Sequence, residues 1–302
     1  MPLLSGSASV SRFRVAPVLD DPGFDAHAFR AIAPGSETRE AIGFVPIEPE
    51  APYRAGHDRW FFRVRIDTLR ADPTAVRERL NELVRTEIEQ GLGFVGTKKR
   101  KQLKELAEEE LILEARPRTK IVEGCLDGST LWIGSTAKNV IGRVHEMLRR
   151  LGVGVDVRAP WAERGDPDIE DSVIETYEPG ESVLGSRFLG HLVGDPDILV
   201  EPEAGLVRLR TEDARVTLSG AVLPDLHRYL ERDARLLTAK LIVGESTFRF
   251  DALPFRVSAL RVESDRHEHW TEQLDDRLEK IAAVYGLLDS KYETLAPKIL
   301  RG

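Results

Sequence analysis

The sequence of 302 residues has a single cysteine, Cys125, and no apolar run near the length that spans a bilayer, about 20 residues. One thiol excludes a disulfide framework and a zinc site built from four thiolates, and it favours a reducing compartment. Residues 1–7, MPLLSGS, carry neither a basic leader nor a long apolar segment. We therefore expect a cytoplasmic protein with no membrane partner.

Positive charge is also in deficit, with 43 Lys and Arg against 51 Asp and Glu and a net charge of −8. The deficit is local, because residues 160–204 hold twelve acids and two basic residues, so the remainder of the chain carries +2. The acidic total argues against a protein coated in positive charge, but it leaves room for a local basic surface that faces a polyanion. A hydrophobic content of 41% excludes a disordered or collagen-like chain.

Strand and helix patterns alternate in the first 160 residues. We expect strands over 10–18, 42–47 and 60–66, where β-branched and aromatic residues gather, and a short helix over 24–32. We expect Asp72 to cap a helix that has Pro73 at its first position, and Gly91 can end that helix. A second helix is expected over 97–113.

A two-residue turn signal follows at Asp127-Gly128, which predicts a hairpin between strands over 121–126 and 129–133. Ser135 or Thr136 then caps a predicted helix that Gly152 ends. Further strands are expected over 206–209, 216–218, 236–243, 247–250 and 257–262, with a helix over 224–231.

The most regular pattern lies at the C-terminus. Apolar residues recur there at alternating intervals of four and three, at Leu274, Leu278, Ile281, Tyr285, Leu288, Tyr292 and Leu295. This narrow seam predicts one long helix that lies along another element. Either a core helix within the chain or a dimer contact is consistent with it.

These patterns predict an α+β fold in three parts along the chain. Residues 1–159 form an N-terminal α+β region with the lysine-rich helix and the hairpin. Residues 160–204, acidic and with five prolines, form a connecting region, and residues 205–302 form a C-terminal α+β region.

A basic cluster marks the second predicted helix, at residues 96–104, GTKKRKQLK. At 100° per residue, Arg100, Lys101 and Lys104 share one helix face, with Lys98 at its edge and Leu103 and Leu106 on the opposite side. Further along, the positive region continues with Arg116, Arg118 and Lys120. Such cations satisfy DNA phosphates without contacting any particular base.

A solvated face is the alternative for this helix. Glu105 and Glu108 follow Lys101 and Lys104 at i,i+4 spacing, and each exposed pair contributes only about 0.2–0.5 kcal/mol. A weaker prediction adds Arg208 and Arg210, which one strand would place on the same face as each other and on the same DNA-binding surface.

Other motifs lack the context that their chemistry requires. Gly91 and Gly96 frame a G-x-G-x-x-G pattern, but it follows a predicted helix rather than a strand. In His267-Glu268-His269 the zinc-protease pattern would require a histidine at position 271, where the chain has Thr271. Cys125 has no recognisable catalytic partner. We expect no enzyme, no cofactor and no metal.

Several segments, in order, resemble the recombination-associated protein RdgC family. Residues 96–105, GTKKRKQLKE, are similar to its lysine-rich helix, and residues 42–46, IGFVP, to its early strand. Residues 131–138, LWIGSTAK, leading to 147–152, MLRRLG, are similar to its hairpin-to-helix segment. Residues 205–208, 237–241 and the closing helix match more loosely.

The resemblance implies a ring subunit with several mixed lobes, antiparallel sheets and a long C-terminal helix. It implies a nucleoid-associated homodimer that encircles double-stranded DNA without sequence preference and limits access of the RecA recombinase. Leu111, Leu113 and the C-terminal seam are candidate dimer contacts. The alternative function is an acidic cytoplasmic scaffold, or an unrecognised enzyme, in which the basic helix is only solvated.

Overall fold

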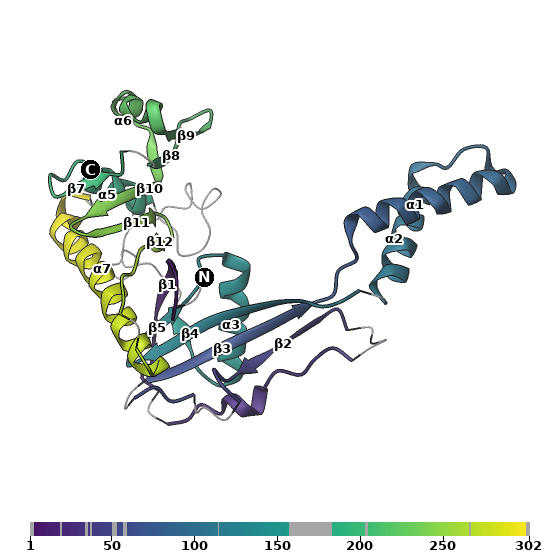
Figure 1. Ribbon diagram of the computed structural model, residues 1–302. Coiled ribbons are helices and arrows are strands. Elements are labelled where there is room, and N and C mark those ends of the chain that lie inside the picture. The colour runs from purple at the N-terminus through teal and green to yellow at the C-terminus, as the bar shows by residue number, and fades with distance from the viewer. Residues whose placement is uncertain are drawn as a thin grey trace. The chain divides into compact units, whose positions relative to one another are not determined.

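The computed structural model describes residues 3–18, 20–33, 36, 38–49, 53–56, 59–113, 115–156, 183–202, 205–265 and 267–299. It shows a mixed α/β protein with a large antiparallel sheet and a long C-terminal helix (Figure 1). Two compact units make up the chain: unit 1 comprises residues 1–22, 50–62 and 122–302, and unit 2 comprises residues 23–49 and 63–121. The units do not follow the expected sequential division, because two boundaries fall inside the strands β3 (Arg59–Thr68) and β4 (Arg118–Asp127).

Unit 1 holds most of the sheet. Its further strands are β1 (Ala8–Val15), β5 (Thr130–Ile133), β6 (Val155–Asp156), β7 (Ile198–Val200), β8 (Leu206–Arg210), β9 (Arg215–Ser219), β10 (Arg235–Val243), β11 (Ser246–Asp251) and β12 (Arg256–Leu260). Their order is β4-β5-β1-β12-β11-β10-β8-β9, with β6 beside β1 and β7 beside β10. The six strands expected in this unit outside the hairpin region are confirmed for β1 and β8 to β12, with ends shifted by up to three residues.

The β4–β5 hairpin is confirmed. Asp127 pairs with Thr130, and Gly128 has a φ of 56° in the turn between them. Glycine adopts this left-handed conformation without a steric cost, which is why Asp-Gly favours a two-residue turn.

Helix α3 (Lys138–Arg150) buries the apolar face that its sequence predicts. Its predicted start is wrong, because Ala137 is the N-cap residue and its N–H donates to Ser135 Oγ over 3.2 Å. The backbone stays extended before Lys138, where the Thr136 carbonyl accepts a hydrogen bond from Arg256 Nη1 over 3.1 Å. Thr136 is thus engaged with β12, and the helix is capped one residue later, at Ala137.

Helix α7 (Trp270–Ile299) confirms the C-terminal prediction, and it runs along the sheet of unit 1 (Figure 1). Its seam is the core of this unit, since the residues from Leu274 to Leu288 that compose it are at most 1% exposed. Tyr285 fixes the helix to two strands, because its hydroxyl donates to the Val10 carbonyl over 2.7 Å and accepts from the Val257 N–H over 3.2 Å.

Helix α5 (Val183–Val193) lies in the stretch expected to connect two regions. Leu184, Phe188, Leu189 and Leu192 are fully buried, and the helix packs against β10 and α7. This part of the stretch therefore belongs to the core of unit 1. The expected connection over residues 157–182 lies outside the described residues.

Between β9 and β10 the chain forms a 3-10 segment, η4 (Gly220–Asp225), and a short helix, α6 (Leu226–Leu230). The helix expected over 224–231 is thus confirmed in a shorter form, because Pro224 lies in the 3-10 segment that precedes it.

Unit 2 contains β2 (Glu40–Val45), which pairs antiparallel with the end of β3. The helix expected over 24–32 is wrong, since only a 3-10 turn, η1 (Phe24–His27), forms. The following residues are extended instead, and the Phe29 N–H donates to the Phe44 carbonyl over 2.8 Å. Gly43 permits this approach, because a Cβ there would lie 2.3 Å from Phe29 Cα.

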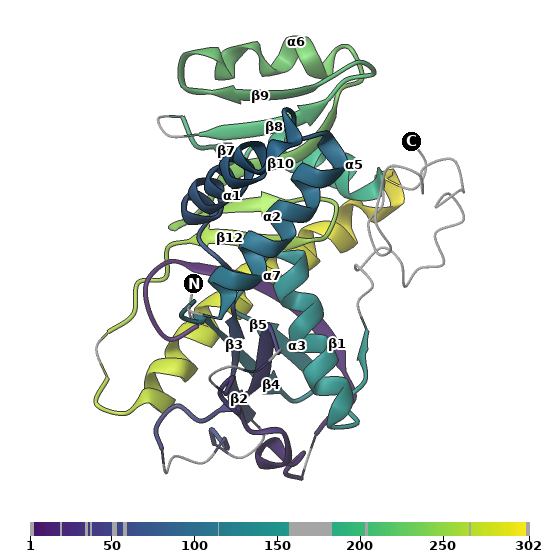
Figure 2. The same cartoon turned by 90° about the vertical axis from the view of Figure 1, so that its right-hand side faces the viewer.

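The rest of unit 2 is a helical hairpin of α1 (Pro73–Glu87), the π-helical turn η2 (Ile88–Leu92) and α2 (Thr97–Ile112). Both helices were expected from the sequence and are confirmed. They lie side by side between the ends of β3 and β4 (Figures 1 and 2). None of the described helices is both long and apolar enough to cross a membrane.

Candidate nucleic-acid interface

The helical hairpin of unit 2 is held at its base and along its length. Asp72 caps α1, because its carboxylate accepts hydrogen bonds from the Thr74 and Ala75 N–H groups over 2.8 and 3.1 Å. These bonds lower the pKa of Asp72 below its usual value. Two ion pairs join the helices, Arg79 with Glu110 at 2.7 Å and Lys99 with Glu87 at 2.8 Å.

The packed side of α2 is narrow. Leu103 and Ala107 are its buried residues, whereas Leu106 is 43% exposed, so the expectation that Leu106 shares the packed side is wrong. Gly91, with a φ of 101°, turns the chain between the two helices. Four of the five basic residues of α2 are exposed, and the fifth, Lys99, is half-buried against α1.

Lys98, Arg100, Lys101 and Lys104 are all exposed on α2. We call these four residues the α2 basic face. Lys98 and Arg100 have no carboxylate within 4.0 Å among the described residues. Lys99 is different, because its ammonium group is held by Glu87 on α1.

The other two lysines of this face have loose partners. Lys101 Nζ lies 3.9 Å from Glu105, and Lys104 Nζ lies 3.4 Å from Glu108. The Lys101 side chain remains 80% exposed. Pairs of this kind, in water and one helical turn apart, contribute little, about 0.3–0.5 kcal/mol each, so a phosphate can replace the carboxylate.

The start of α2 is electrostatically unusual. Its first turn, Thr97 to Arg100, contains three cations and no acid, and the N-cap residue Gly96 has no side chain with which to cap the helix. The N-terminus of a helix carries partial positive charge and free N–H groups, so each cation there costs about 0.3–1 kcal/mol at low salt. A helix with this arrangement is a ready anion site.

Arg116, Arg118 and Lys120 lie in the same unit and are exposed. Arg118 and Lys120 alternate along β4 with Thr119, whose hydroxyl donates to Asp67 over 2.7 Å. Both basic side chains therefore leave the opposite face of the strand.

Arg208 and Arg210 lie in unit 1. They share one face of β8, because the alternating residues Val207 and Leu209 are fully buried on the other face. Two arginines that the sequence reasoning missed stand in register with Arg210, namely Arg215 on β9 and Arg235 on β10. The pairing of Arg210 with Arg215 could be predicted, because a short turn joins the two strands. The pairing of Arg210 with Arg235 could not, because it joins segments that are distant in the sequence.

The apolar residues predicted to join two subunits differ in their burial. The α7 seam is buried within the chain, so its role as a dimer contact is wrong for the residues that fill the core of unit 1. Leu113 is 67% exposed and remains accessible, and Leu111 is partly exposed.

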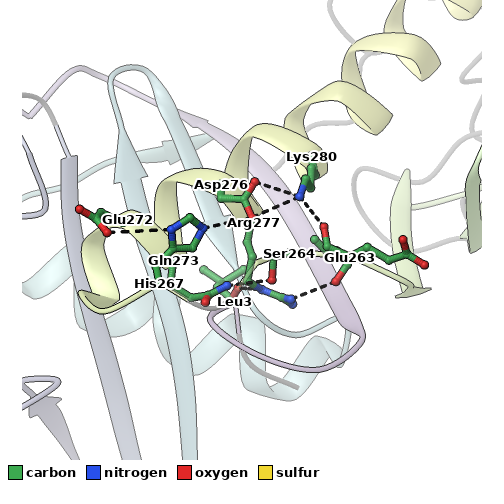
Figure 3. Close-up of polar contacts among 10 residues, drawn as sticks. Leu3, Glu263, Ser264, His267, Glu272, Gln273, Asp276, Arg277 and Lys280 are labelled. Atoms are coloured by element: carbon green, nitrogen blue, oxygen red, sulfur yellow. Dashed lines mark hydrogen bonds and ion pairs between the residues drawn. The ribbon is translucent and has the colours of Figure 1, made fainter.

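The remaining motifs form no metal-binding group in the part of the chain that the structure describes. His267 precedes α7, and Figure 3 shows it between Glu272 and Asp276 of that helix. Its ring nitrogens lie 3.9 Å from the Glu272 carboxylate and 3.6 Å from the Asp276 carboxylate. Cys125 is fully buried, and burial raises the pKa of its thiol.

No protein-family model matches the chain, and no curated protein matches it significantly.

Proposed function

We propose that this protein binds duplex DNA without sequence preference, through phosphate contacts made by the α2 basic face. The observation that carries the proposal is the first turn of α2, where uncompensated cations stand at the positive end of a helix. For stability alone this is the wrong place for them. A phosphate would offset both the side-chain charges and the free N–H groups.

Arg116, Arg118 and Lys120 support the same role, because they add exposed cations of unit 2 just beyond the end of α2. Binding through phosphates alone is independent of sequence and strongly dependent on salt.

Affinity for two short duplexes of unrelated sequence, measured by fluorescence anisotropy, tests this proposal. We expect equal affinities and a slope of log K against log salt of about −0.9 for each phosphate contact. Changing Lys98 and Arg100 to Ala should flatten the slope by about 1.8.

A matched control removes the same charge elsewhere. Arg149 and Arg261 are exposed arginines of unit 1, so Arg149→Ala/Arg261→Ala should leave the slope unchanged. A wild-type protein that does not bind duplex DNA, or equal slopes in all three proteins, would show that the basic helix is merely solvated.

The resemblance to the RdgC family extends the proposal to recombination. In this extension the protein is a non-catalytic homodimer, with Leu113 at the subunit contact, that surrounds DNA in the nucleoid and limits RecA access. The exposed leucine supports such a contact, because the free energy falls when a partner covers a large apolar side chain and removes it from water.

Two measurements test the extension separately from DNA binding. The mass in solution at tens of micromolar should be that of a dimer, and Leu113→Asp should shift it toward a monomer. Dissociation in a salt challenge should be slower from closed circular DNA than from a short linear duplex. Equal rates from a confirmed dimer would remove the encircling mechanism and leave DNA binding intact.

A further inference from the structure

Three arginines lie side by side across neighbouring strands of unit 1. Arg210 of β8 is the direct partner of Arg215 on β9 and of Arg235 on β10. Direct partners in an antiparallel sheet project from the same face, with Cβ atoms about 4.5–5.5 Å apart. We call Arg215, Arg210 and Arg235 the arginine ladder.

The register of the ladder is fixed on both sides. On the β9 side, a tight turn closes next to it, since the Thr211 N–H donates to the Ala214 carbonyl over 2.9 Å and Thr211 Oγ1 accepts from the Ala214 N–H over 3.1 Å. On the β10 side, Asp233 adopts a φ of 55° and the Ala234 N–H donates to the Tyr229 carbonyl over 3.1 Å. These backbone hydrogen bonds therefore fix the positions from which the three arginine side chains extend.

The opposite face of these strands explains why the arginines point outward. Val207, Leu209 and Leu236 are at most 1% exposed and fill the core. The core-facing positions anchor the strands, so a slip in register would bury the arginines and is strongly disfavoured.

The positive charge of the ladder is not held in ion pairs among the described residues. None of the three arginines has a carboxylate within 4.0 Å among the described residues, although Glu212 and Asp233 help to line a cavity of about 210 Å³ beside Arg210 and Arg235. Like charges directly opposite one another in a sheet are destabilising. An arrangement that costs stability and presents three planar, fork-shaped donors, with Arg215 and Arg235 exposed and Arg210 half-buried, suits an external anion.

The geometry points to the arginine ladder as a second phosphate-contacting surface for the backbone of duplex DNA. This inference rests on the proposed function and adds Arg215 and Arg235 to the residues that carry it. Two strand spacings of about 4.8 Å spread the three guanidinium groups over about 10 Å, so more than one phosphate group can be engaged. Arginine is suited to this role, because its guanidinium fork matches phosphate oxygens in pairs.

Arg208 stands on the same outer face of β8, two residues from Arg210. Its direct partners are Thr217 and Thr238, so it is not flanked by like charges. Arg208 therefore extends the surface without sharing the repulsion within the ladder.

The test compares Arg215→Ala/Arg235→Ala with the wild type and with the control Arg149→Ala/Arg261→Ala. We expect the ladder variant to flatten the slope of log K against log salt by about 1.8 for duplex DNA, and the control to leave it unchanged. Without DNA, the melting temperature of the ladder variant should equal or exceed that of the wild type, because repulsion is relieved. Lysine at both positions should restore only part of the affinity.

The outcomes separate this inference from the proposed function. A wild-type slope in the ladder variant, together with a flattened slope after Lys98→Ala/Arg100→Ala, would overturn the ladder and keep DNA binding. A clear loss of melting temperature in the ladder variant would show a structural role instead. Inorganic tripolyphosphate should compete weakly at equal phosphate concentration, and tight competition would assign the ladder to a small polyphosphate rather than to DNA.

Discussion

Helices α7 and α2 differ in what their side chains contact. The apolar seam of α7 is buried in the core of unit 1, whereas α2 in unit 2 buries only Leu103 and Ala107. The first helix is held by burial, at about 25 cal/mol for each Å² of apolar surface. The second is held by a narrow contact with α1 and presents most of its surface to solvent.

The charges on the two helices differ in the same way. Lys291 of α7 is held by Asp195 at 2.7 Å, and this hydrogen-bonded pair raises the pKa of Lys291 and lowers that of Asp195. Lys280 is likewise paired with Asp276 at 2.9 Å. Lys98 and Arg100 of α2 have no such partner among the described residues. The comparison teaches that the side chains of α7 are committed to the fold, while α2 carries two exposed cations that no carboxylate of the described residues holds.

The largest loss of stability should follow from truncating one side chain of the α7 seam. Leu278→Ala removes a side chain that is 1% exposed and should lower the free energy of unfolding by about 2–5 kcal/mol. Urea denaturation measures this loss. Leu287→Ala on the same helix is the control, because that side chain is 37% exposed and should cost far less. Equal losses would contradict the contrast between the two sides of α7.

A smaller effect concerns acid stability of unit 1. Burial, with the nearby charge of Arg256, lowers the pKa of His145 to about 4. The unfolded chain binds this proton from about pH 6.5 downward, so stability is lost as the pH falls between those two values. We expect wild type to lose about 1–2 kcal/mol more than His145→Leu between pH 7 and pH 4.5. Parallel pH profiles for the two proteins would disprove this role.

A still smaller effect is expected on the affinity for duplex DNA when the acidic partners on α2 are removed. Glu105→Gln/Glu108→Gln removes the partners of Lys101 and Lys104 and frees two cations for phosphate. Two pairs of about 0.2–0.5 kcal/mol correspond to a gain in duplex affinity of about two- to five-fold. Glu109→Gln, which frees no paired lysine, should give a smaller gain. A larger gain from Glu109→Gln would point to net charge alone.

Much of the fold was predictable because its signals are local. The cap at Asp72, the turn at Gly128 and the seam of α7 each arise from residues close together in the chain. The segment after Phe24 was misread because its helical pattern lost to strand contacts with Phe44, which is distant in sequence. Helix α5 was missed because its apolar residues lie within a stretch whose average composition is acidic and rich in proline.

The candidate site also has a part that local sequence predicts and a part that depends on distant contacts. Lys98, Arg100, Lys101 and Lys104 form a face by helical periodicity alone, so their shared exposure was predictable. The arginine ladder was not, because Arg235 reaches Arg210 only through the pairing of β10 with β8. Register between distant strands is a tertiary property that composition and spacing do not encode.

The central claim is that the cations in the first turn of α2 serve binding at the expense of stability. Measuring the melting temperature without DNA and the affinity for duplex DNA on the same Lys98→Ala/Arg100→Ala protein tests it most directly. We predict changes of opposite sign: stability rises by a few tenths of a kcal/mol to about 1 kcal/mol at low salt as the helix dipole is relieved, while affinity falls and its salt slope flattens by about 1.8. A variant that melts at a lower temperature and binds duplex DNA as tightly as the wild type would contradict the account.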